Sequence, residues 1–192
     1  MTQLETLSLH FVSLPPTRNH LSLPPPPGER VTLPTLRILK YRGTGKYLDN
    51  LVAIIDASHA ENMNITFFSQ PTMDASELGR FVEQIETTQT SLNQADVQTS
   101  PHAISISFTG SSSAFRTPLR LQLSCKQIDW QLSLISQICN QFTPFLFYIK
   151  NVGIDINTAD FPNKRGHAGG QAGGEQWPEL VCSFALVQDS YG

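Results

Sequence analysis

The stretch LRILKYRGTGKYLDNLVAIIDASHAENMNI, residues 36–65, contains the pattern that decides the fold. Its first and last six residues share one template: an apolar residue, two free positions, an apolar residue, one free position and a third apolar residue. This template is typical of the strand in a leucine-rich repeat. Between the two blocks, four apolar residues recur at the spacing of one buried helix face: Leu48, Leu51, Val52 and Ile55. The stretch therefore predicts a strand, a helix and a second strand.

The same template occurs five times along the chain. The five blocks are Leu4-Leu7-Leu9, Leu36-Leu39-Tyr41, Ala60-Met63-Ile65, Leu92-Ala95-Val97 and Pro144-Phe147-Ile149. A second helical stripe lies between the third and fourth blocks and consists of Leu78, Phe81, Val82 and Ile85. Asp74 with Glu77 before this stripe has the order of a capping box, which predicts where that helix begins. Two of the three spacings between the first four blocks exceed the roughly 20–29 residues of a typical repeat, so we expect long connecting loops.

After the fourth block the pattern becomes strictly alternating. Residues 102–108 and 119–125 each alternate apolar and polar side chains, which predicts two strands with one buried face. The turn-forming stretch Gly110-Ser111-Ser112-Ser113 follows the first of them, so the simplest arrangement is a β-hairpin inserted into the repeat. A helix is predicted from about Asp129 to Phe142, and residues 145–149 are predicted to return to a repeat strand.

Together these patterns predict an α/β fold. The expected architecture is an irregular leucine-rich-repeat-like solenoid, a curved and mostly parallel sheet with helices on the other side, interrupted by a β-hairpin. We expect one domain over residues 1–192, with a proline-rich loop at 14–32 and a flexible glycine-rich loop at 157–176. Neither end resembles a terminal cap, so the arc is expected to be incomplete.

Composition restricts the class of partner. Charged residues make up 15% of the 192 residues, with 13 basic against 16 acidic residues and a net charge of −3. The chain has no long basic run, which argues against nucleic acid or an anionic membrane as partner. No signal peptide or membrane span is visible, which predicts an intracellular location, cytoplasmic or nuclear. In that setting Cys125, Cys139 and Cys182 are expected to be buried free thiols.

No motif in the sequence predicts catalysis. The five histidines are isolated, with no zinc-ligand spacing, and the Gly110–Ser113 stretch is not a nucleophile elbow. The glycine-rich stretch lacks the ending of a phosphate-binding loop, because an acid, Glu175, follows Gly174. We therefore expect no enzyme activity, no cofactor and no metal site.

The strand template instead predicts a row of side chains that face a partner. In each block the apolar residues point inward, so the alternating positions lie on the exposed sheet face. The candidates are His10, Lys40, Arg42, Asn64, Thr66, Asp96, Gln98, Tyr148 and Lys150. Arginine and aromatic side chains dominate typical binding hot spots, which favours Arg42 and Tyr148. The alternative for each residue is an ordinary solvated surface.

The segments 33–43, 47–57 and 64–68 resemble a large fungal family of F-box and leucine-rich-repeat-like proteins, abundant in mushrooms and their relatives. Residues 125–133, and Trp177-Pro178-Glu179-Leu180 with its following apolar residues, resemble further helix entries of the same family. The F-box itself has no counterpart here, because the first 33 residues have the pattern of a strand and a proline-rich loop.

The resemblance implies the substrate-binding repeat region of a ubiquitin-ligase receptor. A full-length relative would bind a cullin-type ligase through its F-box and a target protein through the repeat, so any link of this chain to the ligase would be indirect. The sequence alone leaves two alternatives open. One is a truncated gene product with no independent function, and the other is a cryptic enzyme whose active site is assembled from distant loops.

Overall fold

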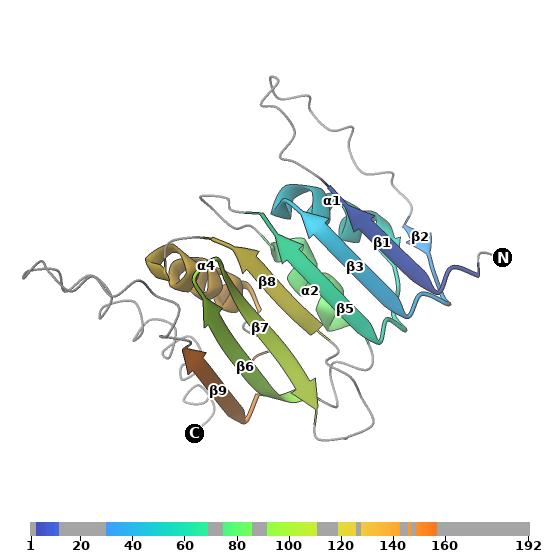
Figure 1. Cartoon of the computed structure of the whole chain (residues 1–192). Helices are drawn as coiled ribbons and strands as arrows, with labels where there is room; N and C mark the ends of the chain where they lie inside the picture. The colour runs from blue at the N-terminus through green and yellow to red at the C-terminus, as the bar shows by residue number, and fades with distance from the viewer. Residues whose placement is uncertain are drawn as a thin grey trace, which may run out of the picture.

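The computed structural model describes residues 3–11, 30–68, 75–85, 92–110, 119–125, 128–142, 146 and 149–156. In this part of the chain the strands form one open seven-stranded sheet in the order β1-β3-β5-β8-β7-β6-β9, and a small separate pair, β2-β4 (Figure 1). Four of the six neighbouring pairs in the large sheet are parallel, and only β7 runs against the rest. The fold is therefore a mixed α/β structure with a mostly parallel sheet.

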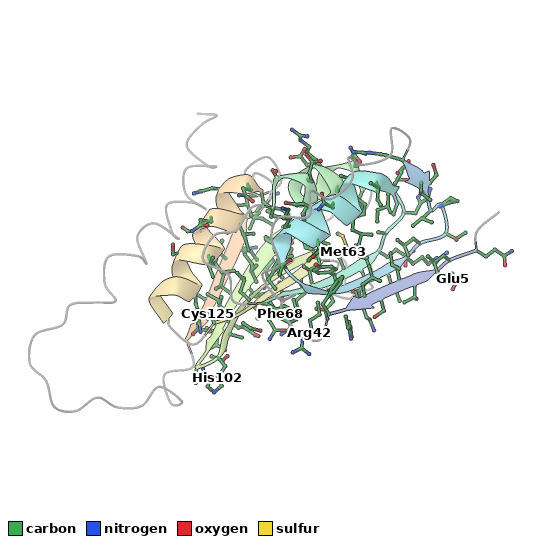
Figure 2. All side chains as sticks on the ribbon, turned by 90° about the horizontal axis from the view of Figure 1, so that it is seen from above. Glu5, Arg42, Met63, Phe68, His102 and Cys125 are labelled. Atoms are coloured by element: carbon green, nitrogen blue, oxygen red, sulfur yellow. The ribbon has the colours of Figure 1, made fainter. Side chains whose placement is uncertain are left out.

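The described residues form nine strands and three helices. The strands are β1 Thr6–His10, β2 Val31–Thr32, β3 Ile38–Gly43, β4 Ile55–Asp56, β5 Asn62–Phe67, β6 Leu92–Ser100, β7 Ala103–Gly110, β8 Leu119–Ser124 and β9 Asn151–Ile156. The helices are α1 Gly45–Ile54, α2 Ser76–Gln84 and α4 Ile128–Gln141. All three lie on the same face of the sheet (Figures 1 and 2).

The core lies between the sheet and these helices. Along β3 and β5 the burial alternates residue by residue, because successive side chains of a strand point to opposite faces. Figure 2 shows Met63 on the helix side and Arg42 on the opposite side of the sheet. The fully buried side chains of β3, β5, β7 and β8 thus build one continuous layer, which includes Leu39, Ile65, Ile106 and Leu121.

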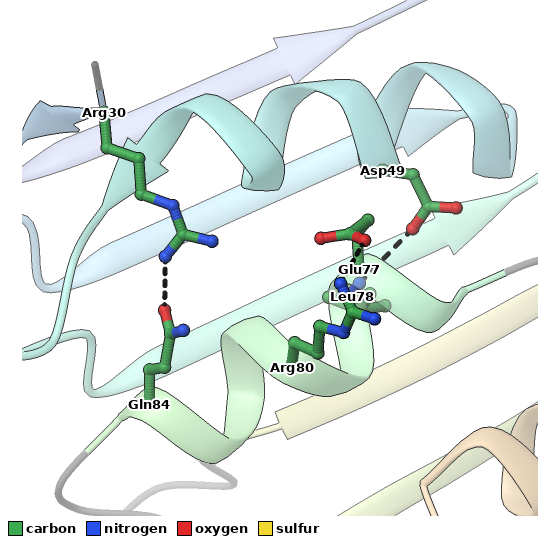
Figure 3. A network of polar contacts seen from close by, with 6 residues as sticks. All are labelled: Arg30, Asp49, Glu77, Leu78, Arg80 and Gln84. Atoms are coloured by element: carbon green, nitrogen blue, oxygen red, sulfur yellow. Dashed lines mark hydrogen bonds and ion pairs between the residues drawn. The ribbon is translucent and has the colours of Figure 1, made fainter. Parts of the chain in front are cut away.

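Helices α1 and α2 pack side by side, and a hydrogen bond joins them (Figure 3). The backbone N–H of Leu78, in the first turn of α2, donates to Oδ1 of Asp49 in α1 at 3.3 Å. A carboxylate at a helix N-terminus satisfies an N–H that has no partner within the helix. Asp49 therefore supplies from the neighbouring helix the cap that Ala75, at the N-cap position, lacks a side chain to provide.

Helix α4 is joined to the second half of the sheet by Gln131, whose side chain is fully buried. Its Nε2 donates to the carbonyl oxygens of Ser100 at 3.0 Å and of Cys125 at 2.7 Å. Ser100 is the last residue of β6, and Cys125 directly follows β8. One amide group therefore holds the helix to the ends of two strands. Buried carbonyls that lose such a donor carry a desolvation cost.

Most predicted elements are confirmed. The first four template blocks lie on β1, β3, β5 and β6, and the three predicted helices correspond to α1, α2 and α4. The two alternating stretches form β7 and β8, which pair antiparallel as a hairpin. The predicted hairpin thus stands between β5 and β6, so the third and fourth blocks are not neighbours.

Several details of the prediction were wrong. In the fifth block Leu146 is helical and Ile149 precedes the strand, because β9 begins only at Asn151. Val31–Thr32, assigned to the proline-rich loop, forms β2 and pairs with β4. Helix α2 has Ala75 rather than Asp74 at its N-cap. Residues 14–29 of the proline-rich loop and the glycine-rich loop 157–176 lie outside the described residues, as does the Trp177–Leu180 stretch that resembles a helix entry.

No helix among the described residues combines the length and the apolar character needed to cross a membrane. The observed fold is the mixed, mostly parallel sheet, and the leucine-rich-repeat interpretation of it is a proposal.

Candidate interaction face

The sheet face opposite the helices, called here the open face, carries two polar rows that cross all seven strands. In register order from β1 to β9, the first row is Ser8, Lys40, Asn64, Arg120, Ser107, Asp96 and Gly153. The second row is His10, Arg42, Thr66, Gln122, Ser105, Gln98 and Asp155. Within the described part of the chain, no helix or strand lies over these rows (Figure 2).

Seven of the nine predicted partner-facing residues lie in these two rows. They are His10, Lys40, Arg42, Asn64, Thr66, Asp96 and Gln98. Most of them are exposed, and Thr66 and Asp96 are half-buried. The sequence pattern therefore placed these side chains on the correct face. Their role in binding stays a prediction.

The other two candidates do not join the rows in the described structure. Tyr148 lies outside the described residues. Lys150 is exposed but precedes β9, and its N–H donates to the carbonyl oxygen of Asn93 at 2.8 Å. In the alternation of β9, Gly153 and Asp155 occupy the open face, so Lys150 was assigned to the wrong position. The cause is the misplaced fifth strand.

The sequence prediction also missed residues that complete the open face. Four of these come from the hairpin: Ser105 and Ser107 on β7, and Arg120 and Gln122 on β8. Their polar positions in the two alternating stretches were a usable signal, but only if the hairpin continues the main sheet. Asp155 was missed because the last strand was placed too early.

An aromatic group supports the basic part of the open face. The guanidinium carbon of Arg42 lies 5.9 Å from the ring centroid of Phe68, within the range of a cation–π contact (Figure 2). Phe68 follows β5, and its N–H donates to the carbonyl oxygen of Gly43 at 2.9 Å. The ring therefore limits the positions open to the Arg42 side chain.

A hollow of about 480 Å³ lies toward the other end of the open face, over β8, β7, β6 and β9. Its lining residues are Asp96, Val97, Gln98, Ser107, Thr109, Arg120, Gly153, Ile154 and Asp155. A Cβ atom on Gly153 would lie 2.6 Å from Oδ1 of Asp96. The missing side chain at Gly153 therefore leaves room for the carboxylate of Asp96 above β9.

The carboxylate of Asp96 is also held in place by its own strand. Nε2 of Gln94 lies 3.1 Å from each of its oxygens and donates to them. Carboxylates have about four lone-pair sites, so Asp96 keeps accepting capacity toward the hollow.

The thiols of the described residues do not contribute to this face. Cys125 and Cys139 are free and buried, which confirms the prediction for these two, while Cys182 lies outside the described residues. Burial raises the pKa of the Cys139 thiol from 9.0 to about 12, so this group stays protonated and unreactive in the folded protein. Among the described residues, no group of three His, Cys, Asp or Glu side chains could hold a metal ion.

No family model, no curated protein and no solved structure matches this chain.

Proposed function

We propose that this protein is a non-catalytic protein-interaction module that binds its partner through the open face. The observation that carries the proposal is the placement of two continuous polar rows on a sheet whose other face carries the core. A parallel sheet in an α/β protein usually has both faces covered, since its strands are buried on both sides. A polar face over seven strands that no described helix or strand covers is instead suited to a partner.

The proposal includes the family resemblance. We interpret β1, β3 and β5 with α1 and α2 as irregular leucine-rich-repeat-like units, and the chain as similar to the substrate-binding repeat region of an F-box ubiquitin-ligase receptor. Repeat proteins of this type bind partners on the extended strand surface. An intracellular location belongs to the same proposal, as does an indirect link to a cullin-type ligase through an F-box outside this sequence.

The proposal can be tested by site-specific photo-cross-linking in a cell extract. A photoreactive amino acid replaces Asn64 on the open face, and in a matched control it replaces Arg80, which is exposed on α2. We expect the Asn64 position to cross-link a defined set of proteins that the Arg80 position does not reach.

The specificity of these cross-links is checked with the double variant Lys40→Ala and Arg42→Ala. Both side chains are exposed, so the variant should keep the circular dichroism spectrum and melting behaviour of the original protein. Loss of the Asn64-specific cross-links in this variant would support the proposal. Identical cross-links from Asn64 and Arg80, or none from Asn64, would reject it.

A further inference from the structure

We propose that the open face recognises a protein segment with ordered charges, in which an arginine or lysine side chain enters the hollow over Gly153 and acidic side chains lie over β3 and β8. This inference rests on the proposed function and names the chemistry of the partner. It follows from how charge is distributed along the two rows and from the shape of the hollow.

The charged side chains of the open face are separated by sign. Lys40 and Arg42 lie on β3 and Arg120 on β8, whereas Asp96 lies on β6 and Asp155 on β9. Neighbouring strands are about 4.8 Å apart, so Arg120 and Asp96 are about 10 Å apart across the sheet, and Lys40 and Asp96 about 19 Å. The two signs thus lie on different strands, and among the described residues no ion pair joins Arg120 to Asp96.

The charges are also not neutralised from elsewhere in the described part of the chain. The ion pairs there join Arg37 to Glu61 and Arg80 to Glu77, away from both rows, and none involves Lys40, Arg42 or Arg120. A face with a basic half and an acidic half attracts a partner whose charges have the opposite order.

The hollow fits a cationic side chain better than a neutral one. Asp96 and Asp155 supply two carboxylates against a single cation, Arg120, at the β8 side of the lining, so the lining has a net charge of −1. Ser107, Thr109 and Gln98 supply neutral acceptors around the carboxylates. A guanidinium group has five N–H donors in a fixed plane and binds carboxylates through two parallel hydrogen bonds. An ammonium group makes the same charge interaction with fewer geometric demands.

The shape of the hollow depends on one missing side chain. Since a Cβ at Gly153 would come within 2.6 Å of Oδ1 of Asp96, any other residue there would displace the carboxylate. Gln94, two residues along the same strand, donates to the same carboxylate. The acceptor is therefore positioned before a ligand arrives, which lowers the ordering cost of binding.

The strand spacing fixes how far apart the charges of the partner must be. The carboxylates on β6 and β9 lie two to five strand spacings from Arg120 and Lys40, which is about 10–24 Å. An extended chain advances about 3.3 Å per residue, so the cationic residue and the acidic residues should be about three to seven positions apart.

The test is a selection from a library of displayed random peptides of about 12 residues, long enough to cross the sheet in extended form. Three forms of the full chain are used as bait: the original protein, the double variant Asp96→Asn and Asp155→Asn, and the double variant Lys40→Gln and Arg42→Gln. The original protein should enrich peptides that combine one arginine or lysine with acidic residues at the stated spacing. The first variant should lose only the cationic preference, and the second should lose only the acidic one.

A double-mutant cycle then measures the contact in the hollow. Replacement of the selected cationic residue by glutamine should weaken binding to the original protein about tenfold, the size of effect expected for a charge-assisted hydrogen bond. The same replacement should have almost no effect with Asp96→Asn. Gly153→Ala should weaken binding of the cationic peptide without changing net charge.

The possible failures are distinguishable. Peptides that bind the open face without charge order, or whose cationic residue is insensitive to Asp96→Asn, would overturn this inference and leave the proposed function intact. Peptides insensitive to every open-face substitution, or no peptides at all, would overturn both. Self-association that depends on protein concentration and disappears with Asp96→Asn would replace the ordered segment by a second copy of the chain.

Discussion

The two halves of the sheet are built by different rules. In the first half, β1, β3 and β5 are parallel, and α1 lies between β3 and β5 along the chain. In the second half, β6, β7 and β8 form an antiparallel meander, and β9 then pairs parallel with β6 through a crossover that contains α4. Both halves nevertheless contribute to the same two rows on the open face. A continuous face therefore does not require a continuous repeat.

The comparison also shows why the two halves were predictable to different degrees. Parallel neighbours need a long crossover, so a repeated strand-helix pattern specifies both the element and its neighbour. A hairpin fixes only the pairing of its own two strands, and leaves open which of them joins the rest of the sheet.

The largest effects are expected from the core, which joins the halves into one cooperative unit. Ile65 on β5 and Ile106 on β7 are both fully buried. Ile65→Ala and Ile106→Ala should each lower the free energy of unfolding by about 2–5 kcal/mol, because each leaves a cavity. Urea denaturation followed by circular dichroism should show a single transition for both variants. Two separate transitions would mean that the halves fold as independent units.

The side chain of Gln131 is expected to stabilise only the second half of the sheet. Gln131→Leu removes two hydrogen bonds to the carbonyls of Ser100 and Cys125 and should cost about 3 kcal/mol. Gln137→Leu on the same helix is the matched control, since the side chain of Gln137 is half-buried whereas that of Gln131 is fully buried. Hydrogen exchange should accelerate at the ends of β6 and β8 in the first variant only. Equal losses from both substitutions would reject this role of Gln131.

Alanine substitutions at two glycines, one in each half of the sheet, are expected to have smaller effects on stability. A Cβ at Gly43, in the first half, would lie 2.5 Å from the hydroxyl oxygen of Tyr41 and 2.8 Å from ring atoms of Tyr41 and Phe11. A Cβ at Gly153, in the second half, would meet one carboxylate oxygen of Asp96. Crowded rings cannot move aside, so Gly43→Ala should destabilise the protein by about 2 kcal/mol. Gly153→Ala should cost less than about 1 kcal/mol, because the Asp96 side chain can rotate. Thermal melts of both variants measure the difference, and a larger loss for Gly153→Ala would contradict it.

The effect expected to be smallest near neutral pH is a dependence of stability on pH, because it appears only in alkaline solution. Burial raises the pKa of Tyr41, in the first half, from 10.0 to about 12, and burial raises the pKa of Cys139, in α4, from 9.0 to about 12. The folded state therefore keeps protons that the unfolded state releases. The free energy of unfolding should be constant below about pH 9 and should fall between about pH 9 and 12.

The contributions of the two groups can be separated by substitution. Tyr41→Phe should remove the part of the decline that begins near pH 10, and Cys139→Ala the part that begins near pH 9. Urea titrations at several pH values provide the measurement. A stability that rises with pH over this range would contradict the burial of both groups.

The sequence predicted the elements better than their arrangement. The template found β1, β3, β5 and β6, and helical stripes such as that of Leu48 and Val52 found the helices, because periodicity reports burial directly. It did not identify β8 as the neighbour of β5, since that pairing joins residues far apart in the chain. It also misplaced β9, where Val152 and Ile154 are exposed in the described structure and the sequence pattern is correspondingly weak.

The residues of the open face were also predictable to different degrees in the two halves of the sheet. The residues contributed by the template strands, such as Lys40 and Asn64, were predictable from alternation alone. Arg120 and Ser107 required knowledge that the hairpin continues the sheet, and Asp155 required the correct start of β9. The hollow depends on Gly153 lying beside Asp96, a cross-strand relation that no local pattern encodes.

The most direct test of the account is the identity of the strand beside β5. In the structure Asn64 lies next to Arg120, whereas an uninterrupted repeat would place Asp96 there. Cysteine pairs Asn64→Cys with Arg120→Cys, and Asn64→Cys with Asp96→Cys, can be treated with a reagent that bridges two thiols through a single carbon. Neighbouring strands are about 4.8 Å apart, and Asn64 and Asp96, three strands apart, are separated by about 14 Å. Mass spectrometry should find the bridge in the first pair only, and a bridge in the second pair alone would contradict the fold and the order of charges on its open face.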